Sequence, residues 1–294
     1  MKDAARLLAY LAATLLFGAI SAPALYWSVQ WLNRQGLLLF LGGYGFETFF
    51  HRALLLGALL FFWPLLRSLL IKDWRGLGLE RNPSALRDGG LGFAAAALPL
   101  LGLGGLLLYL GVYSLRSSVA IGAIADRTLS ALVVPLIEEP LFRGLILGVL
   151  LRRNTPVLAT FFTSATFSIL HFLKAPENAS TVVTWASGFA SMANAFTQFR
   201  EPLLVLAGFT TLFLLGWILA DARIRTRSLW LPIGLHFGWI FASAIFNKIA
   251  RREFVALPWL GKNLLVGVAP LCVALLTWAI VRAWLSHVEK RQPS

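Results

Sequence analysis

Long apolar runs separated by short polar segments dominate the chain. Eight runs are each long enough for a helix to cross a bilayer, which takes about 20 mostly apolar residues. They cover residues 7–29, 48–71, 89–113, 128–151, 155–173, 203–221, 229–248 and 263–286. The segments between them hold charges and helix breakers, as in Glu80-Arg81-Asn82-Pro83. The pattern predicts an all-α protein with one transmembrane domain over residues 1–294. We expect a polytopic membrane helical bundle of about eight transmembrane helices.

Residues 181–199 form a segment of a different kind. Apolar side chains recur there every three or four positions, with Ser, Thr, Asn and Gln between them, at Val182, Trp185, Phe189, Met192, Phe196 and Phe199. This spacing is typical of one face of a helix. The segment has no charge but is too polar to span a bilayer, so an interfacial or re-entrant helix is predicted. It either packs on the bundle or acts as a lid over a site.

The composition supports a membrane protein and argues against a nucleic-acid partner. Only 13% of the 294 residues are charged and 58% are hydrophobic, whereas about 25% of a soluble domain is charged. The mean hydropathy is +0.75. The net charge is +13, from 26 basic and 13 acidic residues. The basic residues lie mostly at the ends of apolar runs, without a basic stripe interleaved with aromatics, which favours lipid headgroups as partners over nucleic acid.

The distribution of basic residues between loops predicts the orientation. With the N-terminus inside, the inner segments hold fifteen Lys and Arg and the outer ones ten. The bias places both termini in the cytoplasm. The last outer loop, with Lys248, Arg251, Arg252 and Lys262, argues against this orientation. The 20 Arg against 6 Lys resemble a GC-rich bacterial coding bias. We therefore expect a multi-pass protein of a bacterial plasma membrane, with the oligomeric state left open.

Ionisable residues inside the predicted spans are the candidates for chemistry, because each costs about 2.5–3.5 kcal/mol near the bilayer centre. The fourth span contains Ile137-Glu138-Glu139-Pro140-Leu141-Phe142-Arg143-Gly144. Glu139 and Arg143 are four residues apart, so they share a helix face and can form an ion pair. Glu138 points about 100° away from them. Two adjacent carboxylates in different environments are a common way to set a general base beside a structural acid. Pro140 removes a backbone donor and opens the helix to water.

Two histidines on later spans complete the set. His171 ends Phe167-Ser168-Ile169-Leu170-His171 in the fifth span, and His236 lies in Leu235-His236-Phe237-Gly238-Trp239 in the seventh. A single intramembrane histidine is often a packing residue. Two of them together with a glutamate pair can converge on one water molecule, so we expect them to surround a single wet pocket with Glu138.

The ordered motifs Glu-Glu-x-x-x-Arg, Phe-x-x-x-His and a later His resemble the CPBP (Abi) family, which includes the Ras-converting CAAX prenyl endopeptidases. The motif region covers residues 128–248. The resemblance implies an intramembrane endopeptidase that cleaves a membrane-associated peptide or protein tail with Glu/His-activated water. It implies that Glu138 activates the water, that His171 orients it and that Glu139 and Arg143 support them.

The resemblance also implies that His236 stabilises the oxyanion of the tetrahedral intermediate. Many family members have an asparagine four residues after this histidine. Here that position is Ile240, which has no side-chain donor.

The sequence leaves the metal question and two other functions open. Either no cofactor is needed, or Glu138, His171 and His236 form a zinc site with Glu139 as the base. No His-Glu-x-x-His motif is present. Buried Glu, His and Arg also mark the proton paths of transporters, although no inverted repeat is evident. A non-catalytic scaffold or immunity factor that keeps the family fold is the other alternative.

Overall fold

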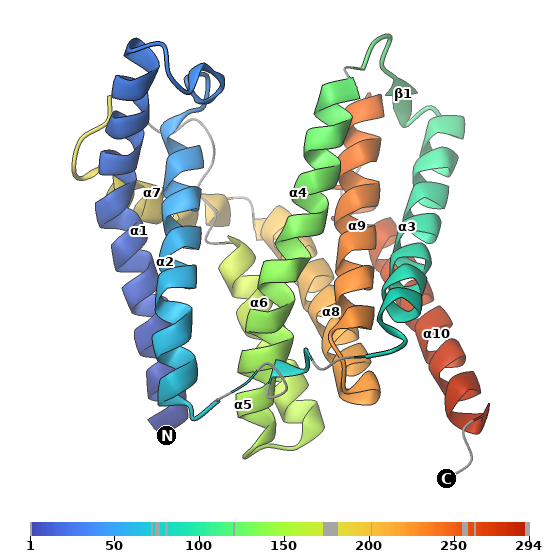
Figure 1. The fold of residues 1–294 in the computed structure, drawn as a ribbon. Coiled ribbons are helices and arrows are strands. Elements are labelled where there is room, and N and C mark those ends of the chain that lie inside the picture. The colour runs from blue at the N-terminus through green and yellow to red at the C-terminus, as the bar shows by residue number, and fades with distance from the viewer. Residues whose placement is uncertain are drawn as a thin grey trace. The chain divides into compact units, whose positions relative to one another are not determined.

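The computed structural model describes residues 2–71, 73, 77–79, 82–119, 121–172, 182–200, 202–254, 258–261 and 263–291, and these are almost entirely helical (Figure 1). The chain divides into two compact units. The first combines residues 1–72 with residues 170–202, and the second combines residues 73–169 with residues 203–294.

The second unit contains most of the helices. They are α3 (Ala85–Tyr109), α4 (Ile121–Glu139), the π-helix η3 (Pro140–Ile146), α5 (Leu147–Leu151), α6 (Pro156–Phe172), α8 (Pro202–Thr226), α9 (Trp230–Ile249) and α10 (Val268–Arg291). The last turn of α6 and the first residue of α8 belong to the first unit. A short antiparallel ribbon joins β1 (Tyr113–Leu115) to β2 (Ala250–Arg252), with Ser114 opposite Arg251. The ribbon therefore ties the end of α3 to the end of α9.

Helix α9 packs between α3 and α4. Its contact with α3 depends on glycine, because a methyl group at Gly234 would overlap the carbonyl of Gly89, and one at Gly238 would overlap the carbonyl of Phe93. Small residues allow membrane helices to approach closely, where dispersion replaces the hydrophobic effect as the source of attraction. Trp239 and Phe246, also on α9, are buried in the hydrophobic core cluster of this unit.

The first unit consists of α1 (Lys2–Arg34), η1 (Leu39–Leu41), α2 (Phe46–Ser68), α7 (Ser187–Ala195) and η4 (Phe196–Arg200). Helix α7 lies crosswise to α1 and α2 (Figure 1). Its small residues face inward: Gly188 packs on the backbone of Ala19, and Ser191 donates a 2.7 Å hydrogen bond to the buried Glu47. Most of the aromatic stripe predicted over residues 181–199 is exposed, at Val182, Trp185, Phe189, Phe196 and Phe199. Residue 181 itself lies outside the described residues.

All eight predicted runs form helices, but the helices differ in length and in apolar character, and so in whether they can cross a membrane. Among the described residues, five helices are long and apolar enough to cross a membrane, namely α1, α2, α3, α8 and α10. The run over 128–151 is interrupted by the π-helix, and the run over 155–173 gives the shorter α6, with residue 173 outside the described part. These two and α9 carry the polar motifs. The all-α membrane fold is thus confirmed, and the helices least suited to lipid are those that carry the candidate site.

Candidate active site

The centre of the site is an ion pair between Glu139, the last residue of α4, and Arg143 in the π-helix. Both are buried, with 0% and 1% of their surface exposed. Arg143 Nη1 donates to Glu139 Oε1 over 2.9 Å, so the pair expected from the four-residue spacing is present. Arg143 Nη2 also donates to the carbonyl of Gly216 on α8 over 3.3 Å. Such partners offset the cost of burying both charges.

An aromatic ring completes the surroundings of the arginine. The guanidinium carbon of Arg143 lies 4.4 Å from the centre of the Phe167 ring on α6, a cation–π contact. Phe167 opens the Phe-x-x-x-His motif, but its contact with Arg143 could not be predicted from the motif. The sequence could not show that Gly216 is the acceptor, because every residue of α8 has a backbone carbonyl.

The π-helix begins at Pro140, directly after the two glutamates. Proline has no N–H to donate to the preceding turn, so the regular α-helical ladder is broken at this residue. Single π-helical turns inside helices often occur at functional sites. The backbone also comes close to a neighbouring segment here, since a side chain at Gly144 would meet the carbonyl of Leu77.

His236 on α9 lies between the two carboxylates and is 6% exposed. Its Nδ1 is 2.7 Å from Glu139 Oε1, the same oxygen that accepts from Arg143. An ionised carboxylate only accepts hydrogen bonds. We therefore assign a proton to Nδ1, which leaves Nε2 toward Glu138, 3.9 Å from its Oε2. A carboxylate behind a histidine fixes the orientation of its ring.

The two glutamates have the different environments that the sequence predicts. The Glu138 side chain is 27% exposed, whereas that of Glu139 is fully enclosed. Glu139 is held by Arg143 and His236, which suits a positioning group. Glu138 is the more accessible of the two side chains, although its Oε2, the oxygen that faces Nε2, is enclosed.

His171 lies in the last turn of α6 and is partly exposed. It follows Phe167 by four residues and so shares its helix face. The ring of Phe167 packs edge-on against the ring of His236, with 5.9 Å between centroids. His171 itself belongs to the first compact unit. Its approach to Glu138 therefore stays a prediction from the sequence.

Ile240 lies one turn beyond His236 on α9 and is half-buried. Asn247 lies two turns further and lines a different cavity, together with Arg127 and Lys248. Its eleven-residue separation from His236 corresponds to about 16 Å along the helix. Asn247 is therefore not a substitute for the missing family asparagine.

The zinc alternative requires three ligands to converge. In the part of the chain that the structure describes, no three His, Cys, Asp or Glu side chains form a group that could hold a metal ion. Glu139, the base of that alternative, is enclosed by Arg143 and His236. His171, the third ligand of that set, belongs to the first unit, so the zinc alternative stays a prediction from the sequence.

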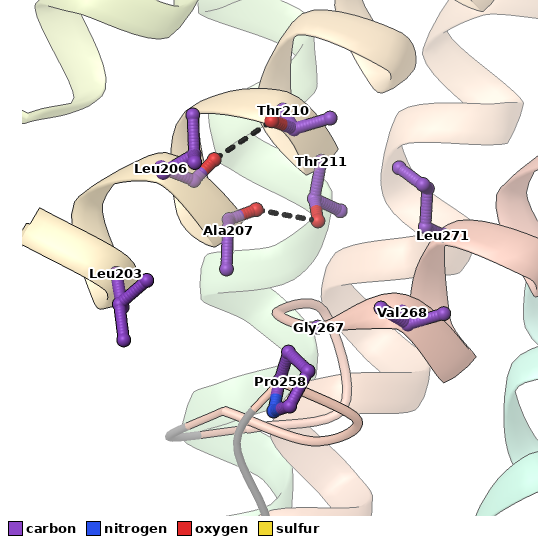
Figure 2. A pocket seen from close by; sticks show the side chains of 9 residues that line it. All are labelled: Leu203, Leu206, Ala207, Thr210, Thr211, Pro258, Gly267, Val268 and Leu271. Atoms are coloured by element: carbon purple, nitrogen blue, oxygen red, sulfur yellow. Dashed lines mark hydrogen bonds between the residues drawn. The ribbon is translucent and has the colours of Figure 1, made fainter.

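A separate cavity of about 310 Å³ lies between α8 and α10 (Figure 2). Its lining is almost wholly apolar, and its two threonines turn their hydroxyls to the helix backbone: Thr210 donates to the carbonyl of Leu206 and Thr211 to that of Ala207. No titratable group is among its described lining residues. The cavity is suited to an apolar group and not to acid–base chemistry.

The fold and the site together define a polytopic helical membrane protein with a carboxylate–histidine site inside its helices. Residues 120–242 match the family model described as type II CAAX prenyl endopeptidase Rce1-like. This segment of the chain is therefore similar to the CAAX-type membrane proteases. The matched segment contains Glu138, Glu139, Arg143, His171 and His236. Comparison with curated proteins and with solved structures finds no match.

Proposed function

We propose that the chain is an intramembrane endopeptidase in which Glu138 activates a water molecule and His236 stabilises the resulting oxyanion. The observation that carries the proposal is the position of the His236 ring, with Nδ1 on the buried Glu139 and Nε2 facing the accessible Glu138. This is a base beside a histidine whose orientation a second carboxylate maintains.

The reaction follows from these contacts. The 3.9 Å between His236 Nε2 and Glu138 Oε2 is too long for a hydrogen bond, but a water about 2.8 Å from both atoms bonds to each. Glu138 takes a proton from the water, and the water oxygen attacks the carbonyl carbon of the scissile peptide. Glu138 then gives this proton to the leaving amine as the C–N bond breaks.

His236 has to donate from Nε2 to the oxyanion, so its ring must carry a proton on both nitrogens. The Glu139 carboxylate, 2.7 Å from Nδ1, accepts the hydrogen bond from that nitrogen and keeps Nε2 turned toward the site. Glu139 is kept in place by Arg143. His171 is proposed to orient the water, as the family resemblance implies. The substrate class we propose is a peptide or protein tail whose cleavage site lies close to the membrane.

The decisive experiment compares Glu138→Gln with the parent protein in liposomes that carry a library of membrane-tethered peptides. Loss of a general base lowers the rate by about 10²–10⁴-fold, measured by mass spectrometry of the products. Asp126→Asn is the matched control, because it makes the same acid-to-amide change at an exposed position of the same helix. Thermal unfolding shows whether both variants keep the fold.

Undiminished cleavage by Glu138→Gln would remove the proposed mechanism. Undiminished cleavage by His171→Ala would remove only the role of that residue. If no peptide is cleaved and Glu138→Gln complements a null strain, a scaffold function replaces the protease. Proton-coupled solute flux that depends on Glu138 would instead favour the transporter.

The same preparation tests the metal question. We expect cleavage to persist after dialysis against a chelator, without stoichiometric zinc in the purified protein. Stoichiometric zinc together with chelator-sensitive cleavage would replace the direct Glu138 mechanism by a metal-dependent one. Elemental analysis and rate measurements on one sample give both answers.

A further inference from the structure

A polar cavity of about 480 Å³ lies at the end of the second unit opposite the α8–α9 turn, where α4 begins and α9 ends. In Figure 1 this end of the two helices lies near β1. The cavity is lined from α9, from the first turns of α4 and from the loop before α4. The lining residues are Arg116, Ser118, Val119, Ala123, Arg127, Ala244, Asn247 and Lys248.

The charges around this cavity are all of one sign. Arg116, Arg127 and Lys248 bring three cations to it, and the described lining includes no carboxylate. Within the described chain, none of these three side chains forms an ion pair with an acidic group. Three like charges around one cavity repel one another unless an anion binds between them.

Neighbouring basic residues are satisfied in a different way. Arg251 pairs with Glu253 over 3.0 Å, and Arg252 donates to the carbonyl of Gly261. Lys262 lies outside the described residues. The basic residues of the predicted outer loops are therefore of two kinds. Some hold the ribbon and its loop together, and the side chains of the three around the cavity have no ion-pair partner in the part of the chain that the structure describes.

The cavity lies far from the candidate active site along the same two helices. Arg127 precedes Glu138 by eleven residues on α4, and Asn247 follows His236 by eleven on α9. Both separations correspond to about 16 Å, which is half of a hydrocarbon core about 30 Å thick. If the active site lies near the middle of the bilayer, the cavity lies at the level of the headgroups.

We propose that this cavity binds the phosphate of an anionic phospholipid headgroup. Arg116, Arg127 and Lys248 neutralise the phosphate, and the hydroxyl of Ser118 and the amide of Asn247 supply further hydrogen bonds. Val119, Ala123 and Ala244 offer apolar contacts for the glycerol and the first methylene groups. The site also gives Lys248, one of the four basic residues that argue against the predicted orientation, a function other than setting topology.

The test uses the full chain purified in a neutral detergent. Native mass spectrometry measures retention of phosphatidylglycerol and of phosphatidylcholine with the same acyl chains. The parent protein is expected to retain the anionic lipid about tenfold or more better, and Arg127→Gln/Lys248→Gln to lose this preference. Arg152→Gln/Arg153→Gln, which removes two charges at the opposite end of the α4–α5 segment, is expected to keep it. Arg127→Lys retains the charge and is expected to keep most of it.

Equal loss of the preference in both double variants would mean general surface attraction and would overturn the proposal. Stabilisation against thermal unfolding by inorganic phosphate as large as that by phosphatidylglycerol would also overturn it, because a free anion would then suffice. Unfolding in phosphatidylcholine alone shows that the variants are folded. The proposal does not depend on protease activity, so it stands or fails separately from the proposed function.

Discussion

At the residue scale, two adjacent glutamates differ because their neighbours differ. Successive side chains on a helix point about 100° apart, so one faces Arg143 and the other does not. Glu139 shares one oxygen between Arg143 and His236, which makes the three side chains a single buried network. In such a network each member's effect depends on the others.

Removing one member of this network should cost more than removing two. Arg143→Leu leaves the buried Glu139 charge with His236 alone, and we expect a loss of about 3–5 kcal/mol in unfolding free energy. Glu139→Leu/Arg143→Leu should recover much of this loss, because no uncompensated charge remains. Cleavage should be lost in both variants. In the double variant His236 lacks its orienting carboxylate, and in Arg143→Leu that carboxylate is no longer held in place by the arginine.

Denaturant unfolding in detergent, together with the cleavage assay, measures both quantities. The matched control is Arg225→Leu, which breaks the partly exposed pair of Arg225 with Asp221 at the same four-residue spacing. That change should cost less than about 1 kcal/mol. If the double variant is as unstable as Arg143→Leu, the uncompensated charge of Glu139 is not the cause of the instability, and the prediction is wrong.

At the element scale, glycine positions decide how closely the helices pack. Gly234 on α9 faces the backbone of Gly89 on α3, whereas Gly105 on α3 has open space around its Cα. Both residues are helical, so alanine reduces backbone freedom equally at the two sites. The difference in stability between the two variants therefore reports the steric overlap at Gly234.

We expect Gly234→Ala to destabilise the protein by about 1–3 kcal/mol, because the added methyl forces α3 and α9 apart. Gly105→Ala should be neutral or stabilising by up to about 1 kcal/mol. Because α9 carries His236, only the first variant should also lower cleavage. Unfolding curves of the two variants provide the comparison, and equal stability would contradict the close contact.

Helix α7 shows a second effect at this scale. Its glycine and serine face packs on α1 and α2, whereas Phe189 on this helix and Trp185, Phe196 and Phe199 beside it are exposed. This reverses the arrangement of a soluble amphipathic helix and is typical of a helix whose apolar face meets lipid. The contact with α1 and α2 favours packing on the bundle over an independent lid.

At the scale of the whole molecule, the ribbon constrains the topology. Because β1 pairs with β2, the α3–α4 and α9–α10 loops lie on one side of the membrane. The count of basic residues predicts that this side is outside. It is the side on which we propose the lipid site.

A labelling experiment tests this orientation. Cys272 is the only cysteine, so Cys272→Ala provides a background free of thiols. In this background an impermeant maleimide should label Ser117→Cys in intact cells. It should label Arg153→Cys only after the membrane is opened. The reverse pattern would invert the topology and move the lipid site to the inner leaflet.

Several features could be predicted from the sequence because they depend on local geometry. Helix formation in lipid follows from the need to satisfy every backbone group within the segment. The Glu139–Arg143 pair follows from the helical repeat, and the order of the motifs indicates the protease family. None of these depends on how distant helices pack.

Other features depend on tertiary structure alone. The contact between Glu139 and His236 joins residues 97 apart, and the cavity gathers Arg116, Arg127 and Lys248 from three segments. The aromatic side chains in and beside α7 are exposed. The physical reason is that both the lipid-facing and the protein-facing sides of a membrane helix are apolar. Hydrophobic periodicity therefore does not reveal which faces meet, and only the packing of small residues and buried charges decides it.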